Sequence, residues 1–199
     1  MRAHVILFAK QPRLGRVKSR LARDIGALRA LAFYRNNLST IVRRLKGDAR
    51  FRLSVAITPD RHKGRNPAWA QGIQMIGQGQ GDLGERMARA IRNAPPGPVI
   101  IIGSDIPFIE RTHLHRALKL LGRTDAVFGP SGDGGYWLVG MNRLKQPNHN
   151  LFRSVRWSGP HALNDSIVTL SKTDDVAFTD QLDDIDDGKA YRLWKAGES

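Results

Sequence analysis

An aspartate, Asp105, follows one of the most apolar stretches of the chain. Residues 98–102 read Pro-Val-Ile-Ile-Ile, and Gly-Ser-Asp comes next. Such a run predicts a buried strand, and ligands of sheets of parallel strands bind beyond the carboxyl ends of the strands. Mg²⁺ in proteins takes one or two carboxylates together with phosphate oxygens and water. We therefore expect Asp105 to be a catalytic residue and a ligand of Mg²⁺ or Mn²⁺. The alternative is that Asp105 only caps the turn before Pro107.

Glycines crowd around a second aspartate, Asp133. Residues 129–137 read Gly-Pro-Ser-Gly-Asp-Gly-Gly-Tyr-Trp. Several glycines cost conformational entropy, and a plain hairpin would need only one. We therefore predict that this turn lies against a ligand, with Asp133 as a catalytic residue that binds an acceptor hydroxyl or acts as a base, and with Gly134 at positive φ. The alternative is a hairpin turn, since Asp-Gly is a strong hairpin signal, with Tyr136 in the core.

The first apolar run lies at residues 5–8, and a basic loop follows it. It reads Lys-Gln-Pro-Arg-Leu-Gly-Arg-Val-Lys-Ser-Arg-Leu over residues 10–21 and runs into a helix. Gly15 permits a tight turn, and the free N–H groups of a helix N-terminus attract anions. We expect Lys18 and Arg20 to point at solvent or at the phosphates of a ligand. The loop lacks the Walker A pattern, and an ordinary basic loop is the alternative.

Two further stretches carry candidate site residues. Residues 81–87 read Gly-Asp-Leu-Gly-Glu-Arg-Met, which predicts a helix start capped by Asp82, with Glu85 completing a capping box. Backbone groups there are placed to contact a base or ribose, and a plain capped helix start is the alternative. The acidic run 183–187 offers a second metal carboxylate, or else a solvated acidic surface.

Elements that can position these residues alternate along the chain. Apolar runs predict strands at 5–8, 53–57, 73–76, 98–102, 126–128 and 137–139, and periodicity predicts helices at 27–45, 82–93, 110–121, 160–171 and 188–195. In the helix 27–45 we expect Leu28, Leu31 and Leu38 on one apolar stripe. Alternation of this kind predicts a single α/β domain over residues 1–199, with a mostly parallel sheet and helices on both of its faces.

The charge of the chain is uneven. The formal net charge is +14, and residues 1–66 hold 17 Lys and Arg against 3 Asp and Glu, so the whole excess lies in the first third. A basic region attracts phosphates, whether of a nucleotide, a nucleic acid or a lipid surface, and a solvated basic surface is the alternative. The absence of cysteine excludes disulfides and thiolate metal sites. We expect a cytoplasmic protein with no signal peptide and no membrane span.

Taken together, these motifs resemble the small glycosyltransferase-like family with the GT-A fold, sometimes labelled radical-SAM/selenodomain-associated transferases. This family lies near the molybdenum-cofactor and phospholactate guanylyltransferases. The motifs run in the same order over almost the whole chain, and the stretch Asp133-Gly-Gly-Tyr is the most specific. The resemblance implies a Rossmann-like GT-A fold with a mixed, mostly parallel sheet.

The resemblance also implies roles for residues. Asp105 would bind the metal, with Asp186 as second ligand. The nucleotide would be bound by residues of three loops: Arg13, Gly15, Lys18, Arg20, Gly81, Asp82, Leu83, Gly84, Arg86, Gly134, Gly135 and Tyr136. Two positions depart from the family pattern. Ser19 stands where Thr is usual, and Asp187-Gly188 stands where Thr-Pro is usual, which leaves the second ligand open between Asp184 and Asp186.

The predicted function is that of a metal-dependent transferase with a nucleotide-sugar or nucleoside-triphosphate donor and a small-molecule acceptor that the sequence does not name. Glycosyl and nucleotidyl transfer need the same phosphate and metal sites, so both remain open. A nucleic-acid-binding protein is a second reading, although no helix-turn-helix, zinc or RNA-recognition motif supports it. A non-catalytic nucleotide-binding regulator is the third.

Overall fold

The computed structural model describes residues 2–60, 66–144 and 146–197. Their strands are β1 (Ala3–Lys10), β2 (Phe51–Thr58), β3 (Gln74–Gly77), β4 (Val99–Gly103), β5 (Ala126–Pro130), β6 (Tyr136–Met141) and β7 (Val176–Phe178). Their helices are α1 (Ser19–Ile25), α2 (Ala27–Leu45), α3 (Leu83–Asn93), α4 (Arg111–Leu121), α5 (Ala162–Val168) and α6 (Gly188–Ala196), with a 3-10 turn at Ala68–Ala70.

The seven described strands form one mixed sheet in the order β3-β2-β1-β4-β6-β5-β7. β6 runs antiparallel to both β4 and β5, and the other pairs are parallel. The predicted α/β fold with a mostly parallel sheet is therefore confirmed, and the antiparallel strand is the one that follows the glycine-rich turn.

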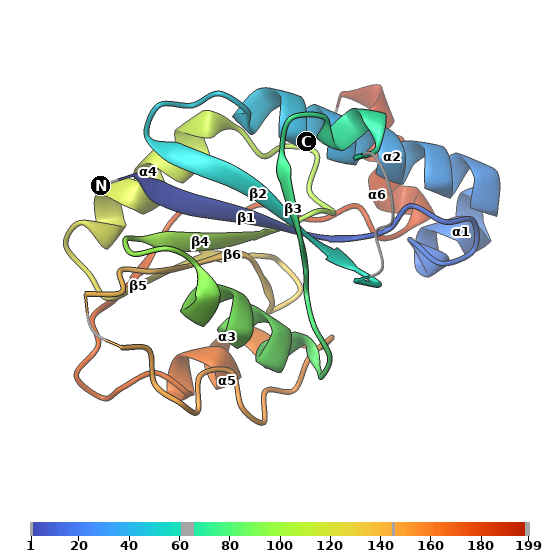
Figure 1. Ribbon diagram of the computed structural model, residues 1–199. Coiled ribbons are helices and arrows are strands. Elements are labelled where there is room, and N and C mark those ends of the chain that lie inside the picture. Colours follow the sequence, from blue (N-terminus) through green and yellow to red (C-terminus); the bar gives the residue numbers. More distant parts are fainter. Residues whose placement is uncertain (1, 61–65, 145, 198–199) are drawn as a thin grey trace.

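Helices cover both faces of the sheet, as the alternation of apolar residues in β1 requires. Val5 and Leu7 pack in the cluster that contains α2 and α4, whereas Ile6 and Phe8 pack in the cluster that contains α3 and α5. Figure 1 shows α3 and α5 on one side of the sheet and α2 on the other. Parallel strands buried on both faces are apolar along their whole length, which is why these strands could be predicted from the sequence.

Two expectations about elements need correction, and one strand was not predicted. The predicted helix 160–171 is shorter, ending as α5 at Val168, and Leu170 is buried beyond its end. Leu28 does not join the apolar stripe of α2, because it lies in the first turn and is 73% exposed. The short strand β7 was not predicted, since three residues carry too little periodicity. None of the described helices has the length and hydropathy needed to cross a membrane.

Candidate functional site

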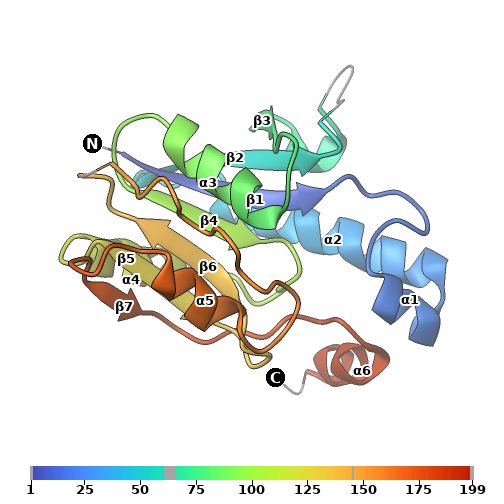
Figure 2. The same cartoon turned by 90° about the horizontal axis from the view of Figure 1, so that it is seen from below.

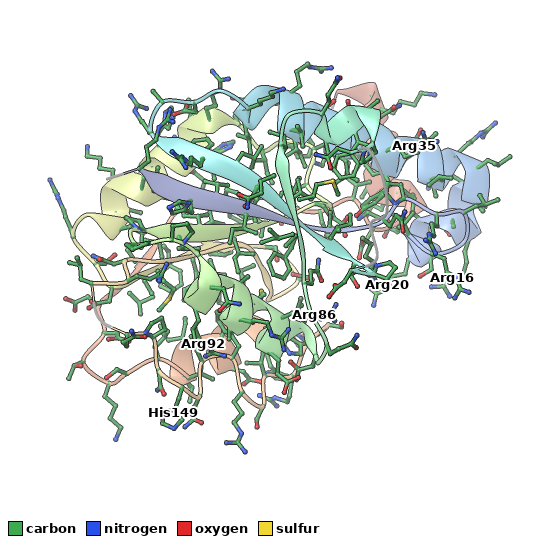
Figure 3. All side chains as sticks on the ribbon, in the orientation of Figure 1. Arg16, Arg20, Arg35, Arg86, Arg92 and His149 are labelled. Atoms are coloured by element: carbon green, nitrogen blue, oxygen red, sulfur yellow. The ribbon has the colours of Figure 1, made fainter. Side chains whose placement is uncertain are left out.

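A cleft of about 630 Å³ opens at the carboxyl ends of β1 and β4. Its wall includes the loop after β1 with α1, the start of α3, the loop after β4, the β5–β6 turn and the acidic run, and Trp157, Ser158 and Ala162 add to it. Figure 3 labels Arg20 and Arg86, which line it from α1 and α3. Of the predicted site residues, those that line the cleft are Lys18, Arg20, Leu83, Arg86, Asp105, Asp133, Gly135, Tyr136 and Asp186. Those outside its lining are Arg13, Gly15, Gly81, Asp82, Gly84 and Gly134.

Lys18 is the cation at the centre of the cleft. Its Nζ atom lies 2.7 Å from Asp186 Oδ1 and 3.4 Å from Asp105 Oδ2. The side chain is only 3% exposed, so Lys18 points into the cleft and not at bulk solvent, while its role toward a ligand stays a prediction. Burial opposes the charge on Lys18, but the carboxylates of Asp105 and Asp186 outweigh burial and raise its pKa. The residue adopts a left-handed conformation, with φ 50° and ψ 49°, at the N-terminal cap of α1.

Carboxylates outnumber cations around Lys18. Burial, followed by the charge of Asp186, raises the pKa of Asp184 to about 7. Burial acts in the same direction on Asp186, but Lys18 overrides it and lowers the pKa of that carboxyl. Arg20 adds a more distant and exposed cation, with Nη1 3.7 Å from Asp186 Oδ2. The carboxyl groups of Asp105, Asp184 and Asp186 therefore gather around Lys18, and a bound cation would relieve the repulsion between them.

Buried polar groups of α2 fix the loop that carries Asp105. The Tyr34 hydroxyl lies 3.2 Å from the Ser104 hydroxyl and donates to the carbonyl of Lys10. Asn37 donates to the carbonyl of Ser104 at 2.8 Å. Burial and the charge of Asp105 raise the pKa of Tyr34, so its hydroxyl stays protonated. Sequence reasoning missed Tyr34 and Asn37, although polar groups on the buried stripe of an amphipathic helix were an available signal.

The acidic run is a structured segment with alternating roles. Asp183 accepts from the N–H of Gly132 at 2.7 Å and so ties the run to the β5–β6 turn. Ile185 is buried, and Asp187 caps α6 by accepting from the N–H of Ala190. Asp184 and Asp186, between these anchors, both line the cleft. The interpretation as a solvated acidic surface therefore does not describe this segment.

The β5–β6 turn is ordered by its own aspartate. Asp133 Oδ1 accepts from the Ser131 hydroxyl at 2.6 Å and from the N–H of Gly135 at 2.9 Å. Gly134 has φ 82°, as predicted, and a Cβ atom there would come within 2.5–2.8 Å of the backbone of Pro160. Asp133 thus combines the hairpin role with a position in the wall of the cleft.

The start of α3 has the predicted capping box, in which Asp82 accepts from the N–H of Glu85 and the Glu85 side chain accepts from that of Asp82. Gly84 is required by packing, because a Cβ atom there would meet the carbonyl of Phe152 and the ring of Trp157. Leu83 and Arg86, on the same turn, face the cleft.

A buried glutamine joins α3 to the sheet and was not predicted. The amide of Gln78 donates to the carbonyls of Ala9 and Ala56, and its Oε1 accepts from Arg86 at 3.1 Å. These hydrogen bonds link the backbone near the ends of β1 and β2 to the first turn of α3.

The first loop is turned as expected, although part of it lies outside the cleft. Gly15 has φ 71° and so permits the tight turn, and the carbonyl of Arg13 accepts from the N–H of Arg16. Both Arg13 and Gly15 are exposed.

The carboxylates suit a divalent cation only as a partial ligand set. Asp105 Oδ1 is buried and has no hydrogen-bond partner among the described residues, and Asp186 lies across Lys18 from it. In the described part of the chain, no three or more His, Asp or Glu side chains lie close enough together to hold a metal ion by themselves. Two carboxylates fit Mg²⁺ when donor phosphates and water complete its shell.

The sequence profile of the family described as "Uncharacterized protein conserved in bacteria (DUF2064)" matches residues 41–159, which is more than half of the chain. Among curated proteins, none matches the sequence significantly. The association with radical-SAM and selenodomain proteins stays a prediction.

Solved structures share the fold. A candidate nucleotide-diphospho-sugar transferase from Desulfovibrio desulfuricans G20 superimposes with a TM-score of 0.85 at 24% identity, over 98% of this chain and 87% of that one. A 4-diphosphocytidyl-2C-methyl-D-erythritol synthase from Anaerococcus prevotii DSM 20548 gives 0.60 at 10% identity, over 98% of this chain and 97% of that one. A CMP:2-keto-3-deoxy-manno-octonic acid synthetase in complex with CTP also gives 0.60 at 10%, over 98% of both chains. At these identities the likeness establishes the nucleotide-diphospho-sugar transferase fold.

Proposed function

We propose that this chain, which belongs to the DUF2064 family, is a transferase that takes a nucleoside triphosphate or a nucleotide sugar as its donor. The observation that supports this most directly is the charge arrangement of the cleft. A buried lysine and an exposed arginine face several aspartates at the carboxyl ends of the central strands. Ammonium and guanidinium groups suit donor phosphates, while a divalent cation suits the carboxylates.

Several charged groups of the cleft have a proposed part in this reaction. Arg20 and Lys18 bind the phosphates, and Asp105 with Asp186 holds Mg²⁺ or Mn²⁺. When bound, the metal would neutralise the phosphate charge that repels an incoming acceptor. Asp133 receives the acceptor hydroxyl through its second oxygen, because Oδ1 is already engaged in the turn. Arg86 and Leu83 contact the base or ribose from α3.

Fold neighbours agree with this proposal without deciding between nucleotidyl and glycosyl transfer. One of them is a synthetase in complex with CTP, and another is described as a nucleotide-diphospho-sugar transferase. The two reactions are distinguished by their products, since nucleotidyl transfer from a triphosphate releases pyrophosphate and glycosyl transfer from a nucleotide sugar releases a nucleoside diphosphate.

Calorimetric titration of nucleoside triphosphates and nucleotide sugars, with and without Mg²⁺, tests the proposal. We expect at least one donor to bind more tightly with Mg²⁺. Asp105→Asn keeps a hydrogen-bonding amide but is a poor metal ligand, so it should fold normally and lose the Mg²⁺ enhancement. Asp174→Asn, a change of the same charge outside the cleft lining, is the control. If Asp105→Asn kept the wild-type Mg²⁺ dependence, the metal would have to bind elsewhere. Metal-dependent binding without transfer from any donor would favour a regulator.

A further inference from the structure

A second cavity of about 350 Å³ lies between α3 and the edge of the sheet. Ile6, Ser54 and Ile76 contribute to its lining from the strands, and Ala90 and Ala94 from α3. Figure 2 shows α3 over the sheet with β2 and β3 beside it, and these are the elements that contribute lining residues to the cavity. Its volume falls in the range of small-molecule sites.

Among the described residues, the charged side chains that line this cavity are those of Arg52 and Arg89, and the His4 imidazole joins them. His4 and Arg52 lie side by side on β1 and β2, and Arg89 enters from α3. Among the described residues no Asp or Glu lines the cavity. An acid, Asp60, lies at its rim, because its carboxyl carbon is 2.8 Å from the place a Cβ atom would take at Gly77 of the lining.

A third guanidinium group, that of Arg143, lies behind the groove. Arg143 donates to the carbonyls of Ala94 and Pro95 at 2.7 Å each, and its buried Nε has no partner among the described residues. Burial, followed by the charges of Arg52 and Arg143, lowers the pKa of His4. Like charges gathered in a partly buried place are unfavourable unless an anion joins them.

We propose that this second cavity binds a small organic anion, a phosphate monoester or a carboxylate with an apolar body. The anionic group lies against Arg52 and His4, and the apolar body packs on Ile6, Ile76 and Ala90. Guanidinium groups bind carboxylates and phosphates through paired hydrogen bonds, which suits Arg52. The proposal is independent of the transferase function, since it rests on a different cavity.

The cavity also adjoins the first cleft. Gln78 lines both, and Arg89 donates to the carbonyls of Gln78 and Gln80 at 2.9 and 2.8 Å. An anion that touches Arg89 therefore lies next to the groups that hold α3 against the sheet.

Calorimetric titration with phenyl phosphate and with benzoate tests this site, and benzyl alcohol serves as the neutral analogue. We expect at least one of the anions to bind and benzyl alcohol not to bind. Arg52→Gln, a change at an exposed side chain, should weaken binding at least tenfold. Arg92→Gln removes the same charge from an exposed position of α3 outside the cavity, labelled in Figure 3, and should bind like the wild type.

Because the first cleft also attracts phosphates, the bound anion must be located. The signals of the His4 imidazole, assigned among the six histidines with His4→Gln, should shift as phenyl phosphate or benzoate is added. Arg20→Gln, which removes a cation of the first cleft, should leave that shift unchanged. The proposal is overturned if neither anion binds, if Arg52→Gln binds as tightly as the wild type, or if the His4 signals do not respond.

Discussion

Lys18 is the residue for which sequence reasoning and structure differ most. The sequence shows a lysine in a basic loop, whereas its main partner, Asp186, lies 168 positions away. No local sequence pattern indicates a contact between residues so far apart, so the loop was predicted to point at solvent or at the phosphates of a ligand. Asp105 and Gly134 were predictable because strand ends and positive φ leave local signals. Tyr34, Asn37 and Gln78 were missed, because a buried polar group is recognised only from the partners that surround it.

Lys18→Met tests how much the central ion pairs contribute to stability. The substitution keeps most of the side-chain volume but leaves Asp186 and Asp105 without their buried cation. Removing one partner of a fully buried pair costs about 3–5 kcal/mol, and these carboxylates are partly exposed, so we expect a loss of about 2 kcal/mol. The measurement is urea denaturation without added metal. Lys10→Met, at an exposed position of the same cleft, is the control and should change stability by less than about 0.5 kcal/mol.

The raised pKa of Asp184 predicts that stability falls as pH rises, which is the opposite of what an ion-paired acid would give. Because its pKa is raised to about 7, the folded state keeps a proton that the unfolded chain releases near pH 4. Stability therefore falls as pH rises from about 4 to about 7. Asp184→Asn removes this group, so the free energy of unfolding of the variant, relative to wild type, should increase across that window in metal-free buffer. Asp183→Asn, one residue away in the turn contact, should show no such rise; a parallel pH profile for wild type and Asp184→Asn would contradict the prediction.

At the scale of elements, most strands and helices could be predicted because each has a period or a boundary signal of its own. The capping box of α3 is an example, since Asp82 and Glu85 both lie within one turn. The order of strands could not be predicted, because β6 pairs with β4 across α4 and β5 in the sequence. The contact between α3 and the segment around Phe152 could not be predicted either. Glycine at position 84 is its only sign in the sequence, because a Cβ atom there would meet the carbonyl of Phe152.

The glycine-rich turn gives a prediction at this scale. Gly134→Ala introduces a Cβ atom where φ is 82° and where the backbone of Pro160 leaves no room. Strain and overpacking together should lower the free energy of unfolding by about 2–3 kcal/mol. Gly159→Ala is the matched control, because it lies next to Pro160 and an added Cβ meets nothing within 4 Å. Thermal unfolding of the two variants checks this, and equal stability would show that the turn and the Pro160 segment shift apart freely.

For the whole molecule, the sheet brings distant parts of the chain into one site. The first strand lies between β2 and β4, and the last helix returns to the first ones. Phe33 of α2 stacks edge-on against Trp194 of α6, with ring centroids 5.0 Å apart, and against Tyr191. The acidic run just before α6 is thereby held against Lys18 and Asp105, so the cleft is complete only when both ends of the chain are folded.

This arrangement leads us to propose that the chain is a single cooperative domain. Both faces of the sheet are packed on the same central strands, so loss of one face exposes the apolar residues of the other. We expect one urea transition, with far-UV circular dichroism and tryptophan fluorescence coinciding. Of the four tryptophans, Trp194 reports on α6, and comparison of wild type with Trp194→Phe isolates its signal. An independent C-terminal segment would lose the Trp194 signal at lower urea than the circular dichroism signal. We expect the two signals to change together, because α6 packs on Phe33 of the helix that covers β1 and β2. In addition, Ile185 and Asp186 bind the segment before α6 to Asp105 and Lys18.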